Sequence, residues 1–233
     1  MSLNHSPAIV TDGLVLCLDA ANQRSYPGTG TTWSDRSASG YGGTLANGPT
    51  FDADNKGSIL FDGTDDYVEI DSGNGFYENL TGATWIIWIK FNSFAYTYNQ
   101  IFETFPSSGI NYQLSGLVKN TGKLAFYAYG TGGSQTNYDG VGLHTLTINK
   151  WYQLAYVFKA GQKQEGWVNG VLDGSASSVV SSLVSSQDNV RLSSSSFGTR
   201  CVDGYYSSVT CYNRALTADE IRRNYEATVG RYI

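Results

Sequence analysis

SILFDGTDDYVEID, residues Ser58–Asp71, contains two short β-type runs joined by a turn rich in aspartate. The runs are Ile59–Phe61 and Tyr67–Ile70. Gly63 supplies the backbone freedom that a tight turn needs, and aspartate side chains accept hydrogen bonds from nearby backbone amides. The second run alternates polar and apolar residues, which is typical of a strand with one solvated and one buried face. The stretch therefore predicts two strands joined by an ordered turn.

The composition favours one all-β domain. A chain of 233 residues can bury a large core, and its 27 glycines suit many turns between short strands. Aromatic residues make up 14% and include 17 tyrosines, whose rings can be half-buried while the hydroxyl stays in water. An apolar content of 41% with 15% charged residues argues against disorder. The net charge of −5 argues against nucleic acid or an anionic membrane as the main partner.

The cysteines and the N-terminal sequence bear on the cellular compartment. Three scattered cysteines do not form a disulfide framework. Cys201 and Cys211 are able to approach each other, but free thiols in a reducing compartment are favoured. Met1–Pro7 lacks the basic segment of a signal peptide, and Leu14–Leu18 is too short to span a membrane. We therefore expect folding in a cytoplasm without membrane insertion, and export by a non-classical or virion route stays open.

Short apolar and aromatic runs at close spacing predict the remaining strands. The run ATWIIWIKF, Ala83–Phe91, has the length and β-branched content of a central strand. Asn169-Gly170 lies between apolar pairs and favours a type I′ hairpin turn. The other main expected strands are Leu14–Leu18, Gln100–Phe105, Asn111–Val118, Lys123–Tyr129, Leu143–Ile148, Trp151–Lys159, Asn189–Leu192 and Asp203–Tyr212. Many short strands between glycine-rich turns predict an all-β, two-sheet antiparallel sandwich.

One short helix is predicted near the C terminus. Thr217 and Glu220 have the spacing of a capping box, in which hydroxyl and carboxylate satisfy amides of the first turn. Ile221, Tyr225 and Val229 then recur on one helix face, so this face can dock on a sheet.

Four segments of the chain resemble segments of a known protein family. ILFDGTDDYVEI, ATWIIWIKF, WYQLAYVFK with EGWVNGVLDG, and VDGYYSSVTCYNRALTADEI together resemble the laminin-G-like, concanavalin A-like jelly-roll family. The resemblance runs from Asp12 to Tyr225, so we expect an N-terminal arm at residues 1–11 and one jelly-roll domain at residues 12–233. The segment Gly13–Gly40 is similar to domains of structural proteins from tailed bacteriophages. The fold carries lectins, adhesion modules, glycanases and virion proteins alike.

No catalytic constellation is complete in the sequence. His5 lies near the terminus, His144 lies beside a strand, and there is no G-x-S-x-G elbow. The resemblance implies that a glycanase of this fold carries E-x-D-x-E or E-x-D-x-x-E on one strand, and Glu69-Ile70-Asp71 lacks the second glutamate. We therefore expect no enzymatic activity, with a glycanase that uses Glu69 or Asp71 as the less favoured alternative.

The aspartates of the opening stretch are candidate metal ligands. Asp62, Asp65 and Asp66 offer hard oxygen atoms within one turn, and the resemblance implies that such domains sometimes hold calcium at loop ends. Hydrogen bonds from aspartate to the turn backbone explain the same residues. Asp65 and Asp66 are retained as ligands of a structural calcium ion, and Asp35 is a separate candidate with loop carbonyls.

Carbohydrate binding is predicted from tyrosines in loop-like stretches. Sugar rings stack on aromatic faces, while sugar hydroxyls need polar partners nearby. Ser93–Asn99 and Tyr127–Tyr138 combine tyrosine with asparagine, glutamine and glycine. The candidate ligand-binding residues are Tyr96, Tyr98, Tyr129 and Tyr138, whereas Tyr127, Tyr156 and Tyr206 are expected only to cover half-buried surface.

The residues and the resemblance together favour a non-enzymatic virion structural or surface protein of a tailed phage. Such a protein decorates the capsid or mediates tail or fibre adhesion, and it can bind host glycans. The expected partners are other capsid or tail proteins and host surface glycans, with a homo-oligomeric form left open. The expected location is the virion, after assembly in the host cytoplasm. The alternative is a cellular carbohydrate-binding lectin or adhesion module.

Overall fold

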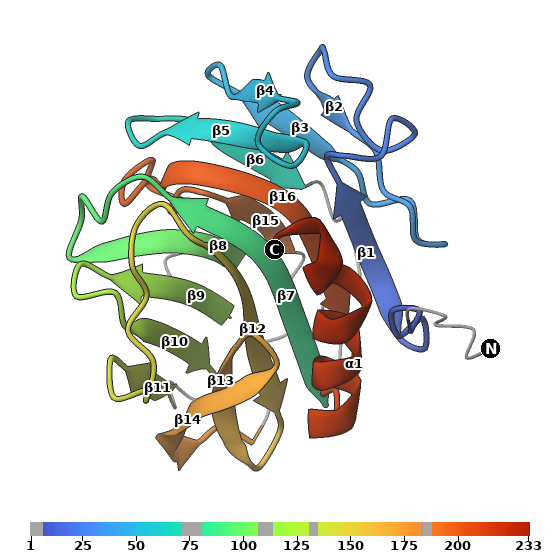
Figure 1. Ribbon diagram of the computed structural model, residues 1–233. Helices are drawn as coiled ribbons and strands as arrows, with labels where there is room; N and C mark the ends of the chain where they lie inside the picture. The colour runs from blue at the N-terminus through green and yellow to red at the C-terminus, as the bar shows by residue number, and fades with distance from the viewer. Residues whose placement is uncertain (1–6, 71–80, 107–113, 131–134, 182, 184–187) are drawn as a thin grey trace.

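The computed structural model describes residues 7–70, 81–106, 114–130, 135–181, 183 and 188–233. In this part of the chain, two eight-stranded antiparallel sheets pack face to face, and one α-helix lies near the C terminus (Figure 1). The prediction of an all-β, two-sheet antiparallel sandwich with a short C-terminal helix is confirmed.

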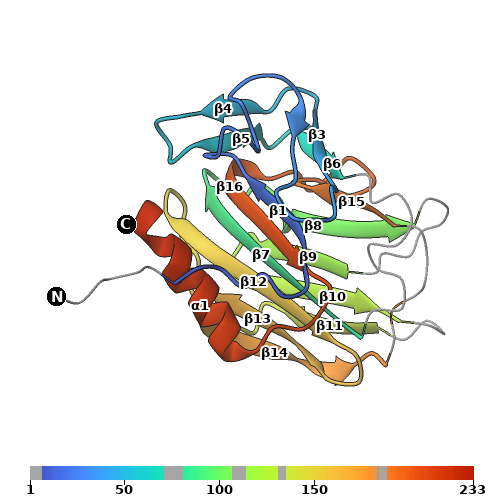
Figure 2. The same ribbon diagram turned by 90° about the vertical axis from the view of Figure 1, so that its right-hand side faces the viewer.

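One sheet is centred on β7 (Gly82–Phe91). Its strand order is β14 (Val171–Val179), β13 (Lys163–Val168), β12 (Trp151–Lys159), β7, β16 (Asp203–Tyr212), β5 (Ser58–Asp62) and β4 (Thr50–Asp52), and β1 (Leu14–Asp19) also pairs with β16. Helix α1 (Ala218–Thr228) lies along the outer face of this sheet (Figure 2), so we call it the covered sheet.

The other sheet contains the remaining strands. Its order is β11 (Gln135–Asp139), β10 (Leu124–Tyr129), β9 (Leu114–Lys119), β8 (Tyr98–Pro106), β15 (Asp188–Leu192), β6 (Tyr67–Ile70), β3 (Gly43–Ala46) and β2 (Thr32–Trp33). Among the described residues, no helix lies on its outer face, so we call it the open sheet.

The core lies between the two sheets and is rich in aromatic rings. Trp85 of β7 stacks on Phe102 of β8, with ring centroids 4.6 Å apart and planes at 18°. Phe126 of β10 and Tyr156 of β12 meet edge to face at 5.6 Å. All four side chains are buried. Because each pair joins one residue from each sheet, these contacts fix how the sheets pack.

The predicted strands of the Ser58–Asp71 stretch are β5 and β6, but they do not pair with each other. β5 belongs to the covered sheet and β6 to the open sheet, so the aspartate turn carries the chain from one layer to the other. Gly63 adopts φ +75°, and a Cβ there would lie 2.7 Å from the Cβ of Asp203. Glycine is therefore required at this crossing for two reasons, backbone angle and space.

The expected hairpin at Asn169-Gly170 joins β13 to β14, and both residues have positive φ, 51° and 76°. These angles are those of the predicted type I′ turn. The segment Leu143–Ile148, in contrast, is not a strand. The backbone N–H of His144 donates to Oδ1 of Asp173 at 2.6 Å, and its Nδ1 lies 2.8 Å from the same oxygen. Since this segment bonds to a buried carboxylate, it does not form a ladder.

Other predicted segments differ from the structure at their ends. The first residues of the expected strand Asn111–Val118 lie outside the described residues, and β9 begins at Leu114. The Ser-rich region that follows Gly174 begins with the last residues of β14. Cys17, Cys201 and Cys211 are all free, as expected.

Helix α1 begins with the predicted capping box. The N–H of Glu220 donates to the Thr217 hydroxyl, and the Glu220 side chain accepts the N–H of Thr217. Ile221 is buried against the covered sheet, while Val229 lies just beyond the end of α1, in a 3₁₀ turn. Within the described ranges, no helix is both long and apolar enough for a membrane span.

The described part of the N-terminal arm lies against α1. The backbone N–H of Val10 donates to Oδ1 of Asn224 at 2.8 Å, and the hydroxyl of Tyr212 donates to the carbonyl of Val10 at 3.0 Å. Residues 1–6 lie outside the described residues. Val10 and helix α1 thus lie together on the outer side of the covered sheet.

Candidate functional site

A row of polar side chains crosses the outer face of the open sheet. In the register of the open sheet, Tyr127 lies opposite Ser115, and Ser115 lies opposite Glu103 on its other side. Glu103 in turn lies opposite Arg191, and Arg191 lies opposite Glu69. Directly paired residues of neighbouring strands point to the same side of a sheet. Three consecutive strands, β8, β9 and β10, and two from other parts of the chain, β6 and β15, therefore place one tyrosine, one serine and three charged groups side by side.

A cavity of about 210 Å³ opens at one end of this row, and we call it the tyrosine pocket. Its lining residues are Tyr98, Glu103, Ser115, Tyr127, Tyr129 and Arg200. The rings of Tyr98 and Tyr127 are 6.2 Å apart with planes at 72°, so they form two nearly perpendicular walls. Such walls offer flat apolar surfaces beside polar groups.

The Tyr98 wall is held in place by its neighbours. Its hydroxyl donates to Oδ2 of Asp139 at 3.2 Å. Lys119 pairs with the same carboxylate at 3.0 Å, and its Nζ lies 5.1 Å from the centre of the Tyr98 ring. The position of this ring is therefore fixed before any ligand arrives.

Glu103 forms the floor of the tyrosine pocket and is only 1% exposed. Its Oε2 accepts the backbone N–H of Ser196 at 2.5 Å. Burial raises the pKa of the Glu103 carboxyl, while the Ser196 hydrogen bonds and the charges of Arg200 and Arg191 act in the opposite direction. The Glu103 carboxylate at the floor of the pocket is therefore a strong hydrogen-bond acceptor in poorly solvated surroundings.

The loop between β15 and β16 supplies the pocket with its rim. Ser193 and Arg200 have φ of 71° and 63°, a left-handed conformation that is uncommon for residues with a side chain. Between them, the N–H of Ser195 donates to the carbonyl of Thr199 at 2.9 Å and closes the loop on itself. This conformation brings the Ser196 amide to Glu103, and Arg200 lies at the pocket.

Arg191, next to Glu103 in the row, already has partners. It pairs with Glu69 at 2.9 Å and donates to the carbonyls of Ser195 and Ser196 at 3.2 and 3.3 Å. Its guanidinium also lies 4.2 Å from the Tyr67 ring centre. Glu69, the carboxylate of the glycanase alternative, is therefore held by a cation, and Asp71 lies outside the described residues.

The four predicted ligand-binding tyrosines separate into three places. Tyr98 and Tyr129 line the tyrosine pocket. Tyr96 lies elsewhere, because its hydroxyl donates to the carbonyl of Gly63 in the aspartate turn at 3.2 Å. Tyr138 is fully buried, and its hydroxyl donates to Asp173 at 2.6 Å. The expectation of an exposed Tyr138 is wrong, since alternate residues of β11 point into the core and Tyr138 is one of them.

Sequence reasoning missed much of the pocket. Tyr127, expected only to cover half-buried surface, is one of its walls. Glu103, Ser115 and Arg200 also line the pocket, and no sequence motif predicts them. One signal was available: Glu103 is a lone charge in the apolar run IFETF, and a buried charge there requires a partner or a function. Tyr156 and Tyr206 are fully buried rather than half-buried.

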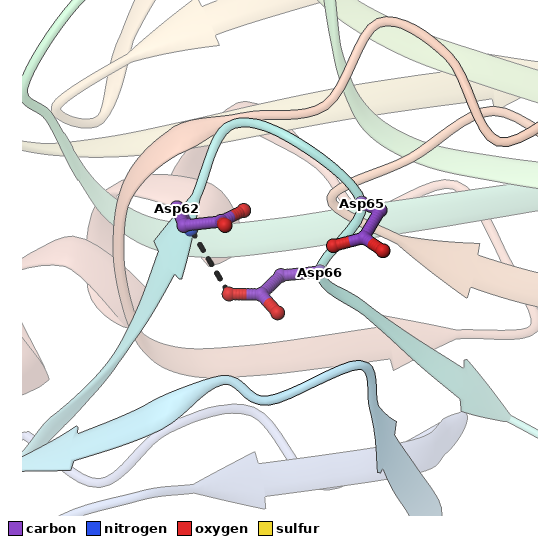
Figure 3. Close-up of side chains that lie close together, drawn as sticks. All are labelled: Asp62, Asp65 and Asp66. Atoms are coloured by element: carbon purple, nitrogen blue, oxygen red, sulfur yellow. Dashed lines mark hydrogen bonds between the residues drawn. The ribbon is translucent and has the colours of Figure 1, made fainter.

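The aspartate turn is a second cluster, separate from the pocket (Figure 3). One carboxylate oxygen from each of Asp62, Asp65 and Asp66 lies within 4.8 Å of the corresponding oxygens of the other two. Asp66 is only 4% exposed, and its Oδ2 accepts the N–H of Asp62 at 3.0 Å. Burial raises the pKa of Asp66, and the charges of Asp62 and Asp65 add to this effect. Three neighbouring carboxylates match the hard oxygen ligands that calcium prefers.

Asp35 does not fit the second metal site that the sequence suggested. Its Oδ1 accepts the N–H groups of Cys17 and Ser37 at 2.7 and 2.8 Å. Its Oδ2 accepts the hydroxyl of Ser37 and the N–H groups of Gly40 and Tyr41. Five donors already occupy the lone pairs of this carboxylate, so Asp35 holds the loop together.

Comparisons with known proteins agree with this architecture. The model of the "Concanavalin A-like lectin/glucanases superfamily" matches residues 62–222. No curated protein matched the chain by sequence.

Three solved structures illustrate the similarity in fold. The receptor-binding domain of botulinum neurotoxin C/D mosaic serotype has a TM-score of 0.70 at 13% identity, covering 94% of this chain and 52% of that one. The botulinum neurotoxin serotype D domain in complex with N-acetylneuraminic acid has a TM-score of 0.68 at 12% identity, with coverage of 94% and 52%. Trypanosoma rangeli sialidase in complex with the inhibitor DANA has a TM-score of 0.66 at 13% identity, with coverage of 95% and 35%.

The chain therefore spans about half the length of the neurotoxin structures and about a third of the sialidase. At these identities the likeness establishes the fold alone. The family match covers most of the chain. The chain belongs to the concanavalin A-like lectin/glucanase superfamily.

Proposed function

We propose that this protein is a carbohydrate-binding module and that its binding site is the tyrosine pocket. The observation that carries the proposal is the combination of two perpendicular tyrosine rings with a buried carboxylate at one cavity. Sugar C–H groups stack on aromatic faces, and sugar hydroxyls donate to carboxylates. The pocket presents both kinds of surface on the open sheet, where no described helix covers them.

The size of the cavity limits what enters it. At about 210 Å³ it is smaller than the range of roughly 300–1,000 Å³ that is usual for drug-sized ligands. We infer that it takes one sugar ring of a longer glycan. The rest of the glycan then lies along the polar row toward Arg191 and Glu69.

The named ligands of similar structures support the class of ligand. A botulinum neurotoxin serotype D domain is described in complex with N-acetylneuraminic acid, and a serotype DC domain in complex with "SialylT". These are ligands of those proteins, and the shared property is only the fold. For this chain, the argument rests on its own tyrosines and on Glu103.

Our proposal includes no chemical reaction at the bound sugar. Hydrolysis of a glycosidic bond needs two carboxylates that flank it, one as acid and the other as base or nucleophile. Glu103 is the one carboxylate among the pocket-lining residues, and Glu69 is held by Arg191 at 2.9 Å. An assay for reducing-sugar release from a β-glucan tests this, with no release expected from the wild type. Release that is lost in Glu69→Gln would make the protein a glycanase.

Substitution of the pocket walls tests the binding site. We expect Tyr127→Ala and Tyr129→Ala each to weaken glycan binding on the order of tenfold, since aromatic stacking contributes about 0.5–1.5 kcal/mol beyond burial. The measurement is a glycan array followed by titration calorimetry with the glycan that binds best. Tyr205→Ala is the matched control, because Tyr205 is a half-buried tyrosine of β16 in the covered sheet. The absence of binding to any glycan on the array, or an equal loss of glycan affinity in all three variants, would contradict the proposal.

We further propose that the module is displayed on the virion of a tailed phage, in contact with capsid or tail proteins. The support is the resemblance of Gly13–Gly40 to domains of such structural proteins. Mass spectrometry of purified particles, together with the identity of neighbouring genes, tests this location. A gene surrounded by cellular genes, with no particle-associated protein, would favour the cellular lectin instead.

A further inference from the structure

Glu103 places a carboxyl group where a bound sugar would meet it. We propose that the tyrosine pocket selects neutral sugars over acidic ones and that Glu103 is the residue that makes this selection. The inference rests on the proposed function, and it names the class of sugar that the site takes.

The first step concerns what Glu103 can accept. An ionised carboxylate accepts hydrogen bonds and donates none. One of its oxygens is engaged by the Ser196 amide at 2.5 Å, and the side chain lines the pocket among Tyr98, Ser115 and Tyr127. A sugar hydroxyl at this floor donates to the carboxylate, whereas a sugar carboxylate meets a like charge.

The second step concerns the strength of that repulsion. Glu103 is 1% exposed, so water screens it poorly. Two like charges at contact distance in such surroundings repel several times more strongly than they do in water. An acidic sugar therefore needs a cation in the pocket to offset its repulsion by the Glu103 carboxylate.

The third step is a search for that cation among the described residues around the pocket. Arg191 is engaged by Glu69 and two backbone carbonyls, and Lys119 is paired with Asp139 at 3.0 Å. Arg200 remains, and it lies on the rim, exposed, with its guanidinium 5.8 Å from the centre of the Tyr98 ring. The charge of Arg200 acts on Glu103, but Arg200 is exposed and screened by water, so it offsets the repulsion only in part.

The proposed selectivity separates this chain from some structures that share its fold. One botulinum neurotoxin domain of this fold is described in complex with N-acetylneuraminic acid, an acidic sugar. The structural likeness alone would suggest the same ligand class here. The buried carboxylate in the pocket argues for the opposite choice.

Matched pairs of glycans test the proposal. The probes are neutral oligosaccharides, the same oligosaccharides with one hexose oxidised to the uronic acid, and the methyl esters of those acids. We expect the wild type to bind the neutral member at least about tenfold more tightly than the acid. The ester, which has no charge but a similar shape, should bind like the neutral sugar.

Glu103→Gln removes the charge and keeps the size and acceptor of the side chain. We expect the preference for the neutral member to fall below about threefold in this variant. Glu226→Gln is the matched control, because it makes the same chemical change at an exposed position of α1. This control should keep the wild-type preference.

The outcomes are distinguishable. Tighter binding of the acids by the wild type would overturn the selectivity and leave the carbohydrate-binding function standing. Weak binding of the ester, equal to that of the acid, would show that shape rather than charge decides, and would also overturn it. A full preference retained by folded Glu103→Gln would remove the role of Glu103. Absence of binding to every probe would remove both proposals.

Discussion

The outer faces of the two sheets carry similar aromatic side chains but meet different surroundings. On the covered sheet, Trp88 stacks on Tyr232 at 3.9 Å and on Tyr225 at 5.8 Å, and its Nε1 donates to the Thr228 hydroxyl. On the open sheet, Tyr98 and Tyr127 form walls of a cavity. The difference teaches that the residue type alone does not reveal a binding face. What packs on top of an aromatic ring determines whether it serves stability or recognition.

The largest expected effect comes from the covered face. Trp88→Ala should lower the free energy of unfolding by about 3–5 kcal/mol, because it leaves a cavity under α1 and removes two ring contacts. Urea unfolding measures this change. Tyr127→Ala on the open face should lower the free energy of unfolding much less, although it weakens glycan binding. If Tyr127→Ala destabilises the fold as strongly as Trp88→Ala does, the two faces do not differ in their contribution to stability.

The aspartate turn joins the two sheets, and calcium tests its role. If calcium binds there, a concentration one hundred times its dissociation constant should stabilise the fold by about 2.7 kcal/mol. The measurement is the melting temperature with calcium and with a chelator. Asp65→Asn and Asp66→Asn should remove the increase, and Asp54→Asn, at an exposed aspartate outside the cluster, should keep it. A melting temperature that is independent of calcium would exclude the ion.

Two glutamates on opposite faces should respond to pH in opposite directions. Hydrogen bonds from Arg214 lower the pKa of Glu220 to about 2, so its contribution to stability is present above the unfolded value of 4.5 and is lost as pH falls toward 2. Burial raises the pKa of Glu103, so its contribution is full below 4.5 and is lost as pH rises through the folded value.

Urea unfolding from pH 2 to pH 7 measures both effects, each expected to be small. Glu220→Gln should flatten the loss of stability below pH 4.5, and Glu103→Gln should flatten the loss above it. Glu226→Gln, the same chemical change at an exposed position of α1, is the control for both. The same pH response from Glu103→Gln and Glu220→Gln would contradict the assignment of one to a buried pocket and the other to a helix cap.

The fold could be predicted from the sequence because its signals are local. The alternation in Tyr67–Ile70, the Asn169-Gly170 turn and the Thr217–Glu220 capping box each act within a few residues. Even here, one relation was not local. The two strands on either side of Gly63 lie in different sheets, and nothing in their own residues specifies that.

The pocket could be predicted only in part, because it depends on the register between neighbouring strands and on a loop from a later part of the chain. Tyr98 and Tyr129 were identified by residue type, but Tyr138 was identified by the same reasoning and is buried. Alternation separates the two faces of a strand, yet it does not say which face meets the core when both carry aromatic rings. The pairing of Glu103 with Arg191 and Ser115 required the assembled sheet.

The β15–β16 loop gives the proposed site an evolutionary consequence. The floor of the pocket lies on strands whose other residues build the core, so changes there endanger the fold. The rim comes from a self-closed loop in which Phe197 is 63% exposed and Arg200 is also exposed. Exposed loop positions accept substitution with little loss of stability. The residues of the rim, and with them the ligand specificity, can therefore change from one lineage to the next while the strands below stay the same.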